Sequence, residues 1–137
     1  MDILVDFDGT CTTHNFPNIG HDIGAPEVLR DLVLAGHRLI LFTMRSDNNG
    51  FKRPNGKIDN NGLTDAINWF KENDIPLYGI QENPTQKSWT SSPKAYGQLI
   101  IDDICLGIPL KVNLELSDRP FVDWPKCRIL MEELGIL

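Results

Sequence analysis

The sequence predicts an α/β fold: a Rossmann-like three-layer α/β/α sandwich with a mainly parallel central sheet. The main observation is that short apolar runs, typical of buried parallel strands, alternate with longer stretches whose apolar residues recur at helical spacing. Such alternation favours right-handed crossovers, which make the strands parallel and place helices against the sheet. A second observation is the length of 137 residues, which suits one domain, residues 1–137, with a core of its own.

The first part of the chain predicts two strands with a helix between them. The apolar run at residues 3–5 is the first strand, and the run at residues 38–42 is the second. Residues 26–35 are expected to form a helix, because Pro26 suits its first turn and Gly36 its C-terminal end.

The rest of the chain continues this pattern. A second helix is expected where apolar residues follow the i, i+3, i+4, i+7 spacing, at Leu63, Ala66, Ile67 and Phe70. Strands are expected at residues 77–80 and 99–101, and alternating apolar residues predict an edge strand at residues 112–116. A last helix is expected between Asp123 and Gly135.

Composition and charge narrow the range of functions and cellular locations that the chain could have. The formal net charge is −6 and the sequence pI is near 4.9, which disfavours the broad basic surface of a nucleic-acid-binding protein. The three cysteines are widely spaced without CxxC pairing, so they are expected to be reduced thiols. The chain opens with a strand rather than a signal peptide, and its apolar runs are too short to span a membrane. A cytoplasmic protein is therefore expected.

Polar side chains follow three of the predicted strands. Asp6 follows the first strand, Thr43 follows the second, and Asp102 and Asp103 follow the strand at residues 99–101. Ligands of open parallel sheets bind beyond the carboxyl ends of the strands, so these residues are expected to meet at one edge. Crowded carboxylates repel each other unless a divalent cation lies among them. Mg²⁺ is the expected ion, because it binds through a few carboxylates together with substrate phosphate.

The first of these strand ends also suggests a reaction. Asp6 could act as a nucleophile that forms an aspartyl-phosphate. Asp8, two residues further on, could protonate the leaving oxygen and then activate water. Gly9 lets the backbone turn sharply, so that N–H groups face the phosphoryl oxygens. Taken singly, Asp8-Gly9 is also a common turn, so the inference depends on the polar residues at the other strand ends.

Four segments resemble, in the correct order, the signature motifs of the haloacid dehalogenase superfamily. They are DFDGT at residues 6–10, LILFT at 39–43, SSPKAYGQ at 91–98 and LIIDD at 99–103. The resemblance covers roughly residues 2–106, and the DxDGT element is its most specific part. An aspartate nucleophile followed by a second acid is the pattern of the superfamily's phosphoryl-transfer enzymes.

The resemblance implies a catalytic role for several positions. Asp6 would be the nucleophile, Asp8 the general acid and base, and Thr43 a hydroxyl donor to the phosphate. Lys94 would neutralise charge on the nucleophile and the transferring group, although Lys87 lies in the same loop.

The same resemblance implies the metal ligands and substrate contacts. Asp102 would bind Mg²⁺ together with Asp6 and the main-chain carbonyl of Asp8, and Asp103 would be an auxiliary ligand or hold a water molecule. Substrate contacts are expected from the first motif and nearby loops, at Phe7, Gly9, Thr10, His14 and Arg45.

The gaps between the motifs leave no room for a separate cap domain, so an open site is expected. Specificity must then come from loops or from a partner subunit in a homo-oligomer. The loop at residues 44–62 carries an Asn-Gly turn and is net positive, through Arg45, Lys52, Arg53 and Lys57. It is either a basic flap that attracts a phosphorylated substrate or a solvated surface loop. His14 either contacts the substrate or is a surface polar residue, and Trp89 either stacks on a ring or anchors its own loop.

The predicted function is a Mg²⁺-dependent phosphatase that acts through an aspartyl-phosphate on Asp6. A nucleotide or a sugar phosphate is the expected substrate, whereas the net charge of −6 disfavours a nucleic-acid end, and no membrane partner is expected. A phosphotransferase or mutase would keep the nucleophile but pass the phosphoryl group to an acceptor other than water. A non-catalytic phosphate-binding protein on the same scaffold is the third alternative.

Overall fold

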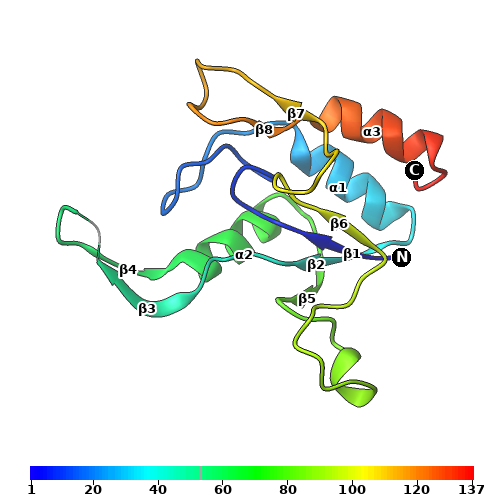
Figure 1. Ribbon diagram of the computed structural model, residues 1–137, viewed down its shortest axis with the longest axis horizontal. Coiled ribbons are helices and arrows are strands. Elements are labelled where there is room, and N and C mark those ends of the chain that lie inside the picture. The colour runs from blue at the N-terminus through cyan, green and yellow to red at the C-terminus, as the bar shows by residue number, and fades with distance from the viewer. Residues whose placement is uncertain (53) are drawn as a thin grey trace.

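The centre of the protein is a four-stranded sheet whose strand pairs are all parallel (Figure 1). The computed structural model describes residues 1–52 and 54–137. The strands lie in the order β5-β2-β1-β6, and their bounds are Leu77–Ile80, Arg38–Leu41, Asp2–Val5 and Leu99–Ile101. They match the four strands predicted from the apolar runs to within one residue at each end. The predicted α/β class with a parallel sheet is confirmed.

Three α-helices are found where the sequence predicts them: α1 at Ala25–Leu34, α2 at Gly62–Glu72 and α3 at Trp124–Glu133. The carboxylate of Asp123 caps α3 by accepting a hydrogen bond from the backbone N–H of Lys126 at 3.2 Å. No helix in the described part of the chain is long and apolar enough to cross a membrane.

All three helices bury their apolar residues against the same face of the sheet. The side chains of Ile3, Val5, Leu39 and Leu41 on this face are fully buried and belong to one core cluster with residues of α1, α2 and α3. These strand residues are odd-numbered because alternate side chains of a strand point to opposite faces.

The opposite face of the sheet is covered by irregular chain instead of a helix. Leu4 and Ile40 pack there against Ala95 and Tyr78, and the segment from residue 81 to residue 98 contains one short 3-10 turn, η1, at Gln86–Ser88. The path from β1 through β2 to β5 runs in one direction, and the return to β6 reverses it. A right-handed return must therefore cross the other face. The third layer is present at that position, but as a loop.

A two-stranded hairpin stands between β2 and α2, where the sequence predicts a loop with an Asn-Gly turn. Strands β3 (Asp47–Lys52) and β4 (Ile58–Asn61) pair antiparallel, and Gly56 in the turn has φ of 82°. The hairpin projects from the body of the protein (Figure 1). Arg53, counted in the predicted basic loop, lies outside the described residues.

The predicted edge strand at residues 112–116 is wrong. Its residues form coil and a turn, in which the backbone N–H of Leu116 donates to the carbonyl of Asn113. The antiparallel pair in this region is β7 (Leu110–Lys111) with β8 (Phe121–Val122). Alternation predicts a strand only where a neighbouring strand can pair with it, and β8 is two residues long.

Candidate active site

The first strand end places Asp6 beside Asp102. Val5 pairs in register with Ile101, and the backbone N–H of Asp6 donates to the carbonyl of Ile101 at 3.0 Å. The chain continues from β1 to one side of the sheet and reaches β6 on the other. The gap between these two strands is therefore the topological switch point, where open α/β sheets bind their ligands.

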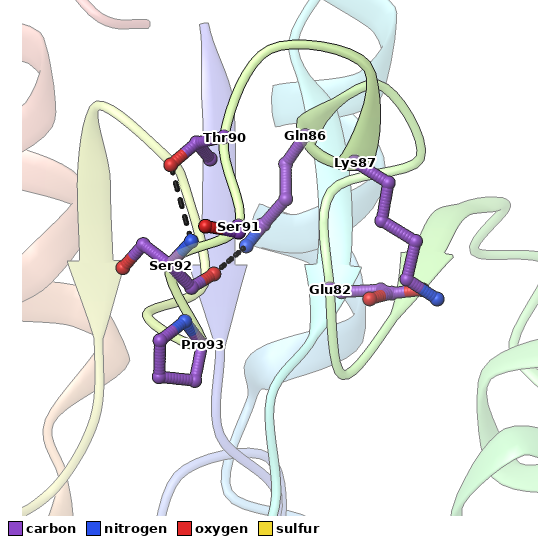
Figure 2. A pocket seen from close by; sticks show the side chains of 7 residues that line it. All are labelled: Glu82, Gln86, Lys87, Thr90, Ser91, Ser92 and Pro93. Atoms are coloured by element: carbon purple, nitrogen blue, oxygen red, sulfur yellow. Dashed lines mark hydrogen bonds and ion pairs between the residues drawn. The ribbon is translucent and has the colours of Figure 1, made fainter.

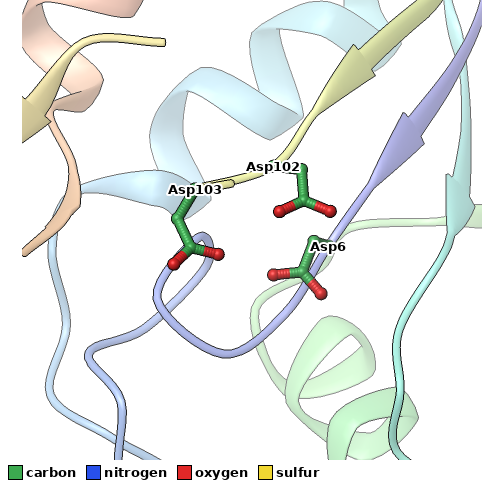
Figure 3. A group of neighbouring side chains, drawn as sticks. All are labelled: Asp6, Asp102 and Asp103. Carbon is green, nitrogen blue, oxygen red and sulfur yellow. The ribbon is translucent and has the colours of Figure 1, made fainter. Parts of the chain in front are cut away.

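Three carboxylates converge at this point, as predicted. Asp6, Asp102 and Asp103 each offer an oxygen, and these oxygens all lie within 4.8 Å of one another. Figure 3 shows the three side chains pointing toward a common centre, from the end of β1 and the end of β6.

Two further residues fix this arrangement. The hydroxyl of Thr10 donates to Asp6 Oδ2 at 2.9 Å and accepts from the backbone N–H of Asp103 at 3.0 Å, so it ties the two strand ends together. His14 Nε2 lies 3.0 Å from Asp103 Oδ2. The ring of His14 therefore contacts one of the converging carboxylates.

The three carboxylates of the cluster repel one another when ionised, and a positive charge among them would stabilise their ionised form. The pKa of Asp6 is raised to about 7, chiefly by burial and in part by the nearby charges of Asp102 and Asp103, against the lowering effect of hydrogen bonds from Phe7 and Thr10. Burial and Asp103 also raise the pKa of Asp102 above its ordinary value. No Lys or Arg side chain forms an ion pair with these carboxylates in the described part of the chain.

The donor set suits Mg²⁺. Carboxylate oxygens at about 2.1 Å from one Mg²⁺ ion lie up to about 4.2 Å apart, which is comparable with the limit of 4.8 Å within which the three oxygens lie. A divalent cation would also remove the mutual repulsion that raises the pKa of Asp6. The residues present therefore fit the predicted metal.

Asp8 points to a different partner. Arg45 Nε donates to Asp8 Oδ2 and Arg45 Nη2 donates to Asp8 Oδ1, both at 2.7 Å. The carboxylate of Asp8, two residues after Asp6, is thus held by a bidentate pair. The sequence predicts Arg45 as a substrate contact, but the structure buries its side chain to 1% exposure against Asp8.

Thr43 follows β2, the strand that pairs with β1. Val5 pairs with Leu41, and the backbone N–H of Phe42 donates to the carbonyl of Val5 at 2.8 Å. The Thr43 hydroxyl oxygen accepts from the backbone N–H of Arg45 at 3.1 Å. No described residue accepts a hydrogen bond from this hydroxyl, which leaves its hydrogen available to a phosphate oxygen.

Gly9 is required by both its backbone and its neighbour. Its φ is 82°, which favours glycine, and a Cβ added there would lie 2.1 Å from Nε2 of His14. The ring of His14 therefore lies directly against the motif loop, in the space that the missing side chain leaves.

Two predicted site residues are placed elsewhere. The side chain of Phe7 is 0% exposed and lies in the core, with its ring in an edge contact with Trp69, so it supports the loop from below. Lys94 lies in the loop on the second face, beside Trp89 and Tyr96. Its ammonium forms no ion pair with any residue that the structure describes. The structure therefore does not bring Lys94 into contact with Asp6.

Trp89 supports its own loop at least in part. Its ring makes an edge contact with Tyr96 at 5.1 Å, and 57% of its surface is exposed. The neighbouring hollow of about 390 Å³ is lined by residues from Glu82 to Pro93 and contains none of the converging carboxylates (Figure 2). The three converging carboxylates lie at the switch point instead.

Sequence reasoning missed two supports of the site. Gln81, which follows β5, accepts from the backbone N–H of Thr43 at 3.0 Å and donates to the carbonyls of Thr43 and Arg45. The sequence signal that could have identified Gln81 is its position directly after the strand predicted at residues 77–80. Trp124 donates from Nε1 to the carbonyl of Thr10 at 2.7 Å. Nothing in the sequence ties Trp124 to the first motif, 114 residues away.

Comparisons with known proteins support the α/β fold of this chain. It is a small α/β protein with a carboxylate cluster at the switch point. No protein-family model and no curated protein sequence matches it. A solved structure of a conserved protein from Bacteroides thetaiotaomicron matches with a TM-score of 0.71 and 30% sequence identity, over 97% of this chain and 90% of that one. The chain belongs to the same family as this conserved Bacteroides protein.

Proposed function

We propose that the protein is a Mg²⁺-dependent phosphomonoester hydrolase of the haloacid dehalogenase type. The observation that carries this proposal is the convergence of Asp6, Asp102 and Asp103 at the switch point, where no Lys or Arg of the described residues forms an ion pair with them. Thr10 donates a hydrogen bond to the Asp6 carboxylate, and Arg45 links Asp8 to Thr43 through its side chain and its backbone N–H.

Asp6, Asp102 and Asp103 would hold the ion, which when bound supplies positive charge to the carboxylates and to the phosphate oxygens. An oxygen of Asp6 attacks phosphorus, and the bond from phosphorus to the ester oxygen breaks. Asp8, in its protonated carboxylic acid form, gives its proton to that leaving oxygen, so that an alcohol and an aspartyl-phosphate are formed and Asp8 becomes a carboxylate. Asp8 then takes a proton from water, the water oxygen attacks phosphorus, and inorganic phosphate leaves as the Asp6 carboxylate is restored. The Thr43 hydroxyl donates to a phosphoryl oxygen throughout.

A small phosphorylated metabolite, such as a nucleotide or a sugar phosphate, is the substrate class we propose. The net charge of −6 supports a small ligand over a long nucleic acid. The segment inserted between β2 and α2 is the β3–β4 hairpin. The cysteines Cys11, Cys105 and Cys127 are all free thiols, which supports a reducing compartment such as the cytoplasm.

The test is a screen of phosphorylated metabolites with Mg²⁺ and with EDTA, in which the Asp6→Asn protein is the blank. Release of inorganic phosphate without an added acceptor, dependent on Mg²⁺ and absent from the blank, is the expected result. Phosphate release only when an acceptor alcohol is supplied would favour a phosphotransferase. Turnover that survives EDTA or the Asp6→Asn change would overturn the proposal.

A further inference from the structure

We infer that Arg45 is a positioning residue, which fixes the carboxylate of Asp8 at the active site and makes no contact with the substrate. The catalytic part of this inference depends on the proposed function, because it concerns the group to which we assign proton transfer. The structural part, a buried and specifically coupled pair, does not depend on any activity.

The guanidinium group of Arg45 has no donor left for a phosphate. It carries five N–H donors, and five hydrogen bonds use them. Two go to the Asp8 carboxylate at 2.7 Å. The others go to the carbonyl oxygens of Pro17 at 3.3 Å, Gly62 at 3.3 Å and Asn18 at 2.8 Å. A substrate phosphate could bind Arg45 only after one of these bonds broke.

Aromatic rings fix the plane of the guanidinium group. The Arg45 Cζ atom lies 4.9 Å from the ring centroid of Phe7 and 5.2 Å from that of Phe16. Such contacts favour a cation over a ring face, and more so when the group is desolvated. Arg45 is therefore held on its polar edge and on its faces, whereas the Asp8 side chain remains 20% exposed and can meet a substrate.

The contacts of Arg45 join segments that are far apart in the sequence. The carbonyls of Pro17 and Asn18 belong to the loop after the first motif, Gly62 begins α2, and Asp8 follows β1. The position of Asp8 is thus set by the loop, by α2 and by the turn after β2. A lysine at position 45 would keep the charge but lose the bidentate geometry and most of these bonds.

The same protein contains a second pair of this chemistry, which provides the control. At the other end of β1, Arg38 Nε donates to Asp2 Oδ1 at 2.6 Å, and the Arg38 Cζ atom lies 4.3 Å from the Tyr78 ring centroid. That pair lies at the amino end of the strands, away from the switch point. Changes there report the general cost of loosening an arginine–aspartate pair.

The experiment is a pair of double-mutant cycles, Asp8→Asn with Arg45→Lys and Asp2→Asn with Arg38→Lys. In the first cycle, Asp8→Asn is expected to lower kcat about 10²- to 10⁴-fold, and Arg45→Lys about 10- to 100-fold with KM changed less than about threefold. In the Asp8→Asn background, Arg45→Lys should lower kcat by less than about threefold further. The control cycle should leave kcat within about twofold of the native value in every variant.

Additive losses of kcat in the first cycle, or a loss for Arg45→Lys that appears mainly in KM, would overturn the positioning role. A fall in kcat of similar size for Arg38→Lys would also overturn it, because general loosening would then explain the effect.

A measurement independent of activity tests the pair itself. The Nε–H proton of Arg45 should give an NMR signal that exchanges slowly with water in the native protein and rapidly in the Asp8→Asn variant. Thermal unfolding of the first cycle should show single changes that each lower Tm by about 10 °C, with the double change no worse than the larger one. If these results hold while the protein shows no turnover, the proposed function fails and the pair stands. Fast exchange in the native protein would overturn the pair itself.

Discussion

The two ends of strand β1 carry aspartates in opposite electrostatic situations. Asp2, at the amino end, accepts from Arg38 Nε at 2.6 Å and from Asn83 Nδ2 at 2.7 Å. Burial acts to raise the pKa of Asp2, but the hydrogen bonds from Arg38 and Asn83 and the charge of Arg38 outweigh it, and the pKa lies below its ordinary value. Asp6, at the carboxyl end, has a hydroxyl partner in Thr10, and burial raises its pKa to about 7.

This difference separates a structural carboxylate from a functional one. A single strand of four residues connects the two groups, so fold position alone does not explain it. Each carboxylate oxygen of Asp2 accepts a hydrogen bond from a protein side chain. Around Asp6 the described residues supply further negative charge, and a strongly perturbed group of this kind in a ligand-binding position is typical of a functional site.

The largest expected effect concerns activity. Asp6→Asn should lower kcat by at least about 10³-fold, because an amide cannot replace the nucleophile. Asp2→Asn, the same change at the other end of the strand, should leave kcat within about twofold. Steady-state kinetics on the best substrate of the screen measures both. Equal losses in the two variants would remove the functional distinction between the strand ends.

The second effect is on the pH dependence of stability. Without metal, folded Asp6 with its pKa of about 7 keeps a proton between about pH 4 and 7, whereas the unfolded chain, with a pKa of about 3.9, does not. The folded state then binds more protons, so the free energy of unfolding should rise as pH falls, by up to about 1.4 kcal/mol per unit. Urea unfolding with EDTA at several pH values measures this. The slope should be reduced in Asp6→Asn, and an unchanged slope would contradict the assignment to Asp6.

Metal binding should give the third effect. Mg²⁺ at about 100 times its Kd should stabilise the native protein by about 2.7 kcal/mol, and Asp102→Asn should abolish most of this gain. Asp65→Asn removes an exposed carboxylate of α2 and should keep the full gain. Thermal unfolding with and without Mg²⁺ measures the shift. If Asp102→Asn retained the native shift, the ion would bind elsewhere.

The smallest expected effect is at the amino end. Asp2→Asn should lower the free energy of unfolding by about 1–2 kcal/mol, since its charge-assisted hydrogen bonds are partly screened by water at Arg38. The pKa of Asp2 is lowered on folding, so its contribution is present above about pH 4 and is lost as pH falls below that value. Urea unfolding of both proteins at pH 3 and pH 7 checks this, and an equal difference at both would contradict it.

The convergence of the carboxylates could be predicted because it depends on local features. Strand ends can be read from apolar runs, and parallel strands bring their carboxyl ends to one edge, so Asp6 and Asp102 were expected at the same edge of the sheet. The role of Arg45 could not be predicted from the sequence, because its hydrogen-bond partners come from three separate segments. A buried arginine also has the same sequence signal as an exposed one. Lys94 shows the same limit, because its spacing fits the motif while its loop follows the second face of the sheet.

The C-terminal part of the chain contributes none of the proposed catalytic groups, yet it touches the loop that carries them. The backbone N–H of Val122 donates to the carbonyl of Gly9 at 2.9 Å, and Trp124 donates to that of Thr10. A chain shortened before residue 121 would retain all the acidic ligands but release the carbonyls that keep the glycine turn in shape. A minimal active fragment should therefore keep the last seventeen residues as well as the first twelve.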